Sequence, residues 1–142
     1  MNVLLVEDNS ADAYLLTEFL GERDSLPLLR RVNDGSEALD YIYKRNGFDG
    51  ETAPDLIILD LGLPRLSGYD VLKQLKEDEK VAGIPIIVLT TSQNPIDEAH
   101  CVRLGADAFF SKPYSVEGYE ELINQLVRVE FPRLMAKRSK PN

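Results

Sequence analysis

Five short apolar runs follow one another along the chain, and polar stretches separate them. The runs at 3–6, 56–59 and 84–89 are almost wholly aliphatic, which is typical of strands buried on both faces of a parallel sheet. The run at 27–32 is weaker and more polar and favours a strand near a sheet edge, whereas 108–110 is a short fifth strand. The pattern therefore predicts five strands.

Apolar residues at helical spacing lie between these runs and after the last one. Asn9 and Ser10 supply a helix N-cap, Gly105 supplies a C-cap, and Pro132 is expected to end or kink the last helix. The helices predicted in this way occupy 11–20, 38–43, 70–76, 95–104 and 116–127.

Strand and helix thus alternate five times with short connections, which predicts an α/β fold with a doubly wound parallel sheet and helices on both faces. The carboxyl ends of all five strands then share one edge of the sheet, where ligands bind in open α/β folds. A length of 142 residues fits a single domain, and a second domain is not expected.

Composition excludes several classes of protein. The net charge of −8 and the pI of about 4.7 argue against direct nucleic-acid binding and against anionic membrane surfaces. The single cysteine, Cys101, and the single histidine, His100, exclude an internal disulfide and a cysteine or histidine metal cluster; Cys101 is expected to be buried and His100 to lie on a helix surface. Without a membrane-length apolar run or a secretory signal, a cytoplasmic protein is expected.

Chemically active residues follow four of the five strands. Glu7 and Asp8 come after the first strand, Asp60 after the third, Thr90 after the fourth and Lys112 after the fifth. Glu7 and Asp8 could merely cap the next helix, but three carboxylates at one edge repel each other and favour a bound cation. Oxygen ligands suit Mg²⁺, and lysine and threonine can bind phosphoryl oxygens. The set predicts phosphoryl transfer onto a carboxylate nucleophile, Asp60.

These residues, in this order, resemble the receiver domain of two-component response regulators over about residues 2–130. Glu7 and Asp8 resemble its acidic metal-binding pair, and Asp60 resembles its phospho-acceptor, with Pro64 and Gly68 at the expected distances. Thr90 resembles its switch threonine. Lys112 resembles its lysine, which precedes a cis-prolyl bond at Pro113.

The resemblance implies further features of the fold and of the site. The sheet is expected to be flavodoxin-like with strand order 2-1-3-4-5, and the backbone carbonyl of Gly62 is expected to be a third protein ligand of Mg²⁺. The receiver domain would span 1–131, followed by a C-terminal tail at 132–142 and no output domain. Such a protein promotes its own phosphorylation and dephosphorylation and is not otherwise an enzyme.

Three segments are similar to cyanobacterial-type phytochrome response regulators: the Glu-Asp-Asn-Ser-Ala-Asp start at 7–12, the loop at 46–54, and Val-Leu-Thr-Thr-Ser at 88–92. This similarity implies a phosphohistidine donor on a sensor histidine kinase, with a phytochrome as the candidate kinase. Phosphorylation would draw Thr90 inward, move Phe109, and remodel the face formed by the fourth helix, fifth strand and fifth helix.

Two positions depart from the family pattern. Phe109 stands where tyrosine is frequent, and it cannot donate a hydrogen bond. Thr91 stands where many members carry alanine or glycine, and it is expected to crowd the path of a hydrolytic water. The aspartyl phosphate on Asp60 is therefore expected to be long-lived.

Two other functions compete with the phospho-receiver hypothesis. A phosphohydrolase of the haloacid-dehalogenase type needs a second aspartate two residues after its nucleophile, and Gly62 at that position argues against it. An unphosphorylated adaptor with the same fold usually loses an acid or the lysine, and both are present here. Phe131, Leu134 and Met135 lie beyond the expected end of the domain, where they either fold back onto it or join a homodimer interface.

Overall fold

The computed structural model describes residues 1–22 and 28–139 and contains one parallel sheet of five strands. The strands are ordered β2-β1-β3-β4-β5, which confirms the flavodoxin-like order expected from the sequence. Pro27, at the start of the second predicted strand, lies outside the described residues. The strands are β1 Asn2–Val6, β2 Leu28–Val32, β3 Leu56–Leu59, β4 Ile86–Thr90 and β5 Ala108–Ser111.

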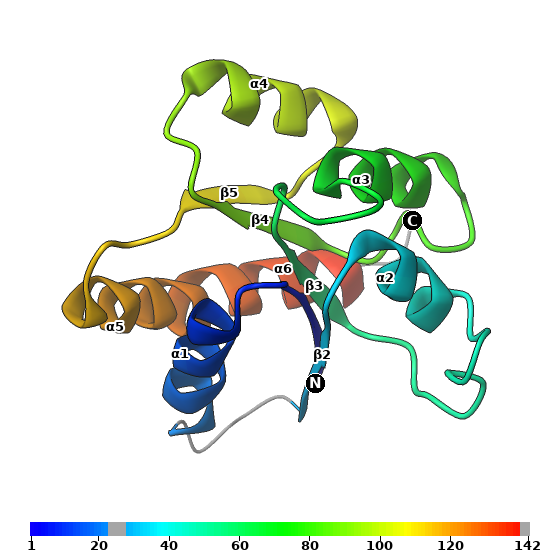
Figure 1. Cartoon of the computed structure of the whole chain (residues 1–142), viewed down its shortest axis with the longest axis horizontal. Helices are drawn as coiled ribbons and strands as arrows, with labels where there is room; N and C mark the ends of the chain where they lie inside the picture. Colours follow the sequence, from blue (N-terminus) through cyan, green and yellow to red (C-terminus); the bar gives the residue numbers. More distant parts are fainter. Residues whose placement is uncertain (23–27, 140–142) are drawn as a thin grey trace.

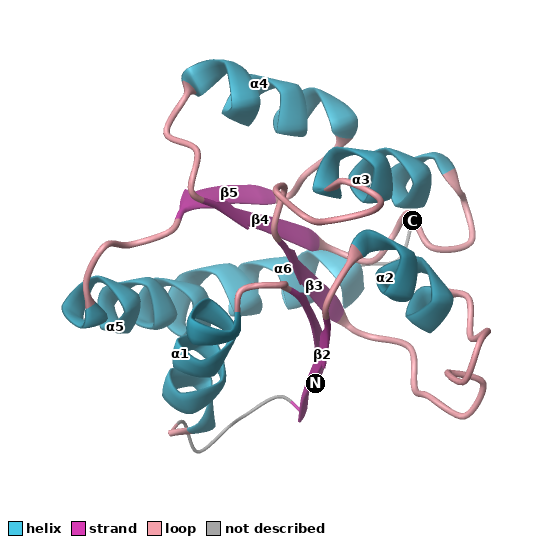
Figure 2. Ribbon diagram, in the orientation of Figure 1, coloured by secondary structure: helices cyan, strands magenta, loops and turns pink. Residues whose placement is uncertain are grey.

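Helices cover both faces of this sheet (Figure 1). The helices α1, α5 and α6 pack on one face, and α2, α3 and α4 pack on the other (Figure 2). Their bounds are α1 Ser10–Gly21, α2 Gly35–Ile42, α3 Gly68–Glu77, α4 Pro95–Leu104, α5 Val116–Gln125 and α6 Phe131–Ser139, with a π-helical segment, η1, at Leu126–Glu130. None of the described helices is long and apolar enough to cross a membrane.

The central strands are buried on both faces, which explains why their sequences are unbroken apolar runs. On β3, Leu56 and Ile58 pack against α1 and α5, whereas Ile57 and Leu59 pack against α2 and α3. All four side chains are buried, because successive residues of a strand point to opposite faces. By contrast, β2 is at the sheet edge and only Val32 of its residues is buried, as its polar sequence indicated.

Each of the helices that follow a strand begins with a side-chain N-cap. Asn9 accepts the backbone N–H of Asp12 at the start of α1, as the sequence indicated, at an N–O distance of 3.0 Å. Gly105 ends α4 with a φ of 104°, the left-handed conformation that glycine adopts without strain. The remaining N-caps, on α2 to α5, are Asp34, Ser67, Asn94 and Ser115.

The end of the chain differs from the sequence prediction at Pro132. We expected this proline to end or kink the last helix; the helix does not end there, since the chain stays helical from α5 through η1 into α6 (Figure 1). Proline has no N–H and its ring clashes with the carbonyl four residues earlier. The wider η1 turn, in which the N–H of Phe131 bonds the carbonyl of Leu126, lets the helix pass this point.

The helix α6 therefore packs on the sheet instead of extending from it. Leu134 is fully buried and Phe131 is 5% exposed, both in the core beneath α1 and α5, and Met135 packs at its edge. For these residues, folding back onto the domain is confirmed. The segment 132–142, expected as a tail, is helical as far as Ser139, and residues 140–142 lie outside the described residues.

Candidate functional site

Three carboxylates meet at the carboxyl edge of the sheet, as the sequence predicted. Glu7, Asp8 and Asp60 each offer one oxygen within 4.8 Å of the others. The strands that precede these acids, β1 and β3, are neighbours in the sheet. Backbone pairing continues past the ends of both strands. The N–H of Asp60 donates to the carbonyl of Val6 at 3.1 Å, and the N–H of Glu7 donates to the carbonyl of Val32 at 3.1 Å. Backbone pairing thus fixes where these acids lie.

The loop after Asp60 is held against the start of α3. The N–H of Gly68 bonds the carbonyl of Leu61 at 3.0 Å, and a β-carbon on Gly68 would lie 2.2 Å from the carbonyl oxygen of Asp60. Only glycine allows this close approach, which explains why glycine is found eight residues after Asp60 in the sequence. The N–H of Gly62 donates to Asp60 Oδ1 at 3.2 Å.

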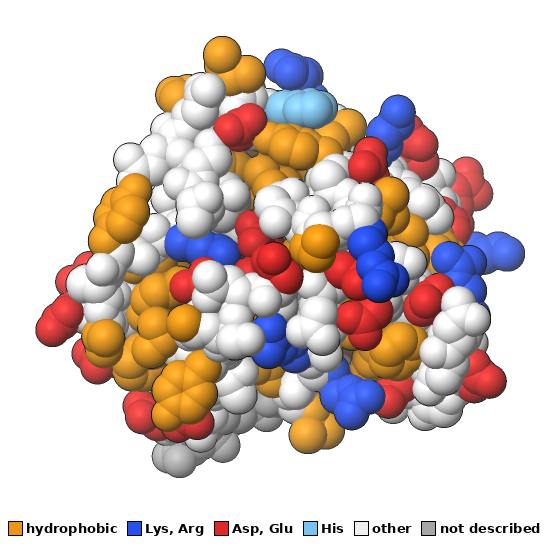
Figure 3. Space-filling view, viewed as in Figure 1, with side chains coloured by type: hydrophobic (Ala, Val, Ile, Leu, Met, Phe, Trp, Pro, Cys, Tyr) orange, Lys and Arg blue, Asp and Glu red, His pale blue; other side chains and the backbone are white. Residues whose placement is uncertain are grey.

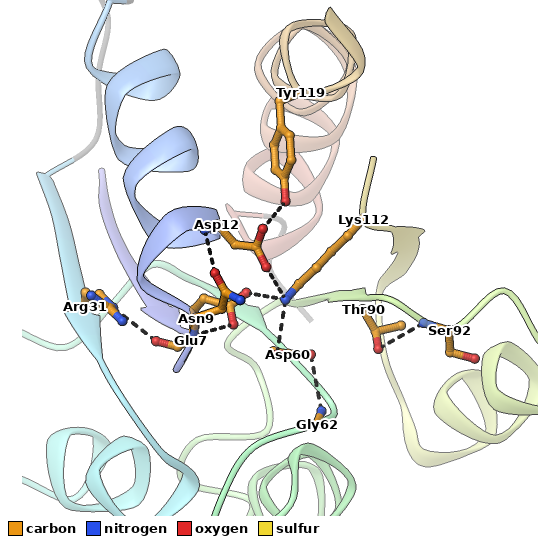
Figure 4. Close-up of polar contacts among 10 residues, drawn as sticks. All are labelled: Glu7, Asn9, Asp12, Arg31, Asp60, Gly62, Thr90, Ser92, Lys112 and Tyr119. Carbon is orange, nitrogen blue, oxygen red and sulfur yellow. Dashed lines mark hydrogen bonds and ion pairs between the residues drawn. The ribbon is translucent and has the colours of Figure 1, made fainter. Parts of the chain in front are cut away.

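Lys112 inserts its ammonium group between the acids (Figure 4). Its Nζ lies 2.7 Å from Glu7 Oε1, 2.9 Å from Asp12 Oδ2 and 3.3 Å from Asp60 Oδ2. The Lys112 N–H also bonds the carbonyl of Thr90 at 2.6 Å, so pairing with β4 continues as far as the lysine. The site therefore draws its charged groups from β1, α1, β3 and β5.

The peptide bond between Lys112 and Pro113 is not cis, in contrast to what the family resemblance implied. All peptide bonds among residues 1–22 and 28–139 are trans. The trans form is intrinsically preferred even before proline, by about 0.5–1 kcal/mol, and here it already places the lysine among the carboxylates. Pro113 itself is half-buried.

Burial and charge act on the same groups. Burial raises the pKa of the Glu7 carboxyl from 4.5 to about 7; its hydrogen bond to Lys112 opposes this rise, and the neighbouring Asp60 adds to it. Burial would lower the pKa of Lys112, but its hydrogen bonds to Glu7 and Asp12 dominate and raise the pKa above its ordinary value. One ammonium thus does not neutralise the cluster, and the donor set of carboxylate oxygens fits a divalent cation.

Carboxylates also gather near the middle of the face in Figure 3, next to basic side chains. In the cluster itself, Glu7 is 1% exposed and Asp60 7%, whereas Asp8 is exposed to solvent. An ion bound to the three acids would therefore be accessible to solvent on the side where Asp8 lies.

Thr90 lies on β4, the strand next to that of Asp60, and it is buried. Its Oγ1 accepts the N–H of Ser92 at 3.4 Å. The Ser92 hydroxyl donates to Asp97 on α4, which also accepts the Tyr69 hydroxyl of α3 at 2.7 Å. The loop that carries Thr90 is thus tied to both helices, while Thr91 is exposed.

The two aromatic residues near this loop, Phe109 and His100, differ in their burial. Phe109 is half-buried and packs against the core under α2 to α4. His100 lies exposed on α4, as predicted, and stacks on Tyr69 with ring centroids 4.7 Å apart. Cys101 is fully buried, also as predicted. The hydrogen bond from the Tyr69 hydroxyl to Asp97 was not predicted from the sequence.

Asp12 and Tyr119 are also site residues that the sequence analysis did not single out. Asp12 bonds Lys112 through one oxygen and accepts the Tyr119 hydroxyl through the other, at 2.9 Å. Burial and this hydrogen bond raise the pKa of Tyr119. One signal was available: Asp12 lies in the first turn of the helix after β1, and therefore at the same edge as the strand-end acids.

A family comparison decides which class of protein carries this geometry. The model of the response regulator receiver domain matches residues 3–124. The chain belongs to this family. The receiver domain identity confirms the resemblance seen in the sequence, and it accounts for an acid cluster with a lysine at the carboxyl edge of a five-stranded parallel sheet.

This receiver is similar in sequence to regulatory proteins of Methanothrix and Synechocystis. The "Probable methanogenesis regulatory protein FilR2" of Methanothrix harundinacea is 36% identical over 124 residues, which are 87% of this chain and 79% of that protein. Response regulator Rcp1 of Synechocystis sp. is 31% identical over 121 residues, covering 85% of this chain and 82% of Rcp1.

Solved structures agree with these sequence relatives. The phosphorylated cyanobacterial phytochrome response regulator RcpA superposes with a TM-score of 0.84 at 32% identity, covering 91% of this receiver and 94% of RcpA. The Mn²⁺-bound form of Rcp1 gives a TM-score of 0.86 at 29% identity, covering 90% and 92%. The predicted similarity to cyanobacterial phytochrome response regulators is thereby confirmed.

Proposed function

We propose that this receiver accepts a phosphoryl group on Asp60 from a phosphohistidine of a sensor histidine kinase. The observation that carries the proposal is the position of Asp60, which ends a central strand and contacts Lys112 beside Glu7 and Asp8. One oxygen of the Asp60 carboxylate attacks phosphorus, the phosphorus–nitrogen bond breaks, and its electron pair stays on the imidazole nitrogen of the donor.

The other site residues stabilise the phosphoryl oxygens. Lys112 donates to one of them as a charge-assisted hydrogen bond, and the Thr90 hydroxyl turns to donate to another. Glu7, Asp8, Asp60 and the backbone carbonyl of Gly62 would hold Mg²⁺, which neutralises charge on the phosphoryl group when bound. The existence of a Mn²⁺-bound form of Rcp1, together with the cluster of three carboxylates here, supports the binding of a divalent cation.

Partners follow from the same comparison. The similarity to RcpA and Rcp1 supports a phytochrome as the sensor kinase. The signal would pass through Thr90 and Phe109 to the face of α4, β5 and α5, where Ile96 and Val102 expose 71% and 60% of their surface. That face is proposed as a homodimer contact. The exposed residues of the C-terminal segment would add to it, since Phe131 and Leu134 themselves face the core. The protein is further proposed to be cytoplasmic and not to bind nucleic acid directly.

The direct test is phosphorylation of the purified protein with acetyl phosphate and Mg²⁺, followed by intact mass spectrometry. Wild type is expected to gain one phosphoryl group, and Asp60→Asn none, because an amide is a poor nucleophile. Asp49→Asn, at an exposed loop position away from the strand ends, is the matched control and should behave as wild type.

The same measurement separates the competing functions. Continuous release of inorganic phosphate without a modified intermediate would indicate the phosphohydrolase, a reading that the receiver family match does not favour. Absence of any modification in wild type, together with absence of beryllofluoride binding, would indicate the adaptor and would overturn the proposal.

Thr91 is proposed to prolong the life of the aspartyl phosphate. It is exposed and directly follows Thr90, so its side chain can crowd the approach of a hydrolytic water. An added barrier of about 1 kcal/mol corresponds to a rate about fivefold slower. Thr91→Ala is therefore expected to lose its phosphoryl group severalfold faster than wild type after the donor is removed. An unchanged or slower rate of loss would refute this role.

A further inference from the structure

Lys112 has three carboxylate partners, and the proposed phosphoryl transfer does not account for one of them. An ammonium group has three N–H donors, and here Glu7, Asp12 and Asp60 lie around it at 2.7, 2.9 and 3.3 Å. The contact with Asp60, the proposed acceptor, is the longest of the three. The resting ammonium is thus held toward β1 and α1, away from the oxygen that would receive the phosphoryl group.

Asp12 is itself held in place. Its Oδ2 accepts Lys112, and its Oδ1 accepts the hydroxyl of Tyr119, which lies on α5 and is 3% exposed (Figure 4). The Asp12 N–H is used by the N-cap Asn9. With both carboxylate oxygens engaged, Asp12 cannot follow the ammonium without losing the Tyr119 hydrogen bond.

The two acids that share Lys112 with Asp60 differ in their access to water. The Glu7 side chain is 1% exposed, whereas that of Asp12 is 22% exposed. When the ammonium moves toward a phosphoryl oxygen, water can replace it at Asp12 but not at the buried Glu7, which needs the ammonium or the proposed Mg²⁺ to balance its charge. Asp12 is therefore the partner that gives way.

We propose that Asp12 is a positioning residue that competes with the phosphoryl group on Asp60 for Lys112, and that Tyr119 strengthens this competition by fixing the Asp12 carboxylate. The inference rests on the proposed function of Asp60. The single contact between Lys112 Nζ and Asp12 Oδ2 must be weakened when the phosphoryl group draws the ammonium away. The resting state is thereby favoured, and the release of Asp12 carries the change to α1 and α5.

The test is the affinity for beryllofluoride, a phosphoryl analogue, measured by ¹⁹F NMR titration at saturating Mg²⁺. Asp12→Asn keeps the shape of the side chain but replaces a charged acceptor by a neutral one, and is expected to bind beryllofluoride on the order of tenfold more tightly. Tyr119→Phe leaves every charge in place and is expected to tighten binding by a smaller factor. In the double variant, Tyr119→Phe should add nothing to Asp12→Asn.

Matched controls separate competition from simpler effects. Glu117→Gln removes an exposed acid from the first turn of α5, and its affinity should equal that of wild type. Unchanged affinity in Tyr119→Phe, with tighter binding in Asp12→Asn, would mean that net charge alone acts and would overturn the role of Tyr119. Equal or weaker binding in Asp12→Asn, while wild type binds, would overturn the competition and leave the proposed function intact.

Two further outcomes are decisive. If wild type binds no beryllofluoride, the proposed function fails and the inference fails with it. If Asp12→Asn does not fold, as judged by thermal melting, Tyr119→Phe decides the matter, because tighter binding supports the competition and unchanged or weaker binding overturns it.

Discussion

Lys112→Met is expected to unfold with a free energy about 3 kcal/mol lower than wild type when divalent cations are removed with EDTA. The physical reason is that Glu7 and Asp60 are buried and each loses its cationic partner, while the methionine side chain only replaces the aliphatic stem. Breaking a buried ion pair in this way leaves charge without compensation, which costs more than the pair itself contributes. Urea unfolding followed by circular dichroism measures the difference.

Saturating Mg²⁺ is expected to restore most of the stability of Lys112→Met, because an ion at the same oxygens replaces the lost positive charge. Lys73→Met removes an exposed lysine of α3 and is the control, with an expected change within about 0.5 kcal/mol. If Lys112→Met in EDTA unfolds at the wild-type urea concentration, the ammonium does not compensate the acid cluster.

Leu134→Ala is expected to lower the free energy of unfolding by about 3 kcal/mol. Leu134 lies on α6 and is 0% exposed, in the same core as Phe131 and the inner residues of α5. Removing three buried carbon atoms forfeits their transfer free energy and leaves a cavity that a sheet-packed helix closes only in part. The measurement is again equilibrium unfolding in urea.

Val129→Ala supplies the comparison for Leu134→Ala. Val129 lies in η1, five residues earlier, with 46% of its surface exposed, and its truncation should change stability by less than about 1 kcal/mol. Equal, small effects of the two substitutions would show that α6 does not contribute to the folded core. A large effect of Leu134→Ala alone would establish that the domain needs residues beyond the last predicted helix.

The sequence predicted the sheet well because its strands have a simple cause. Four consecutive aliphatic residues at 56–59 fit only a position with helices on both sides, and the strand order then followed from the family resemblance. The N-cap at Asn9 and the C-cap at Gly105 were equally readable, since each depends on one residue and its nearest neighbours. Local causes of this kind lie within a few residues of their effect.

The C-terminal segment was harder for the opposite reason. The proline rule at Pro132 is local, but it was overridden when a π-helical turn allowed Leu134 to reach the core. Whether that burial outweighs the cost of an irregular turn depends on side chains from β1, α1 and α5, which are distant in the sequence. The residues next to Pro132 in the sequence therefore do not determine whether the helix continues.

By itself the sequence determined the doubly wound sheet and the gathering of Glu7, Asp8, Asp60 and Lys112 at one edge, because parallel topology brings all strand ends together. Only the tertiary structure decided how Lys112 divides its three hydrogen bonds. Asp12 and Tyr119 join the site across 100 and 107 residues of chain, through distances of about one hydrogen bond, and such contacts depend on how helices seat on the sheet.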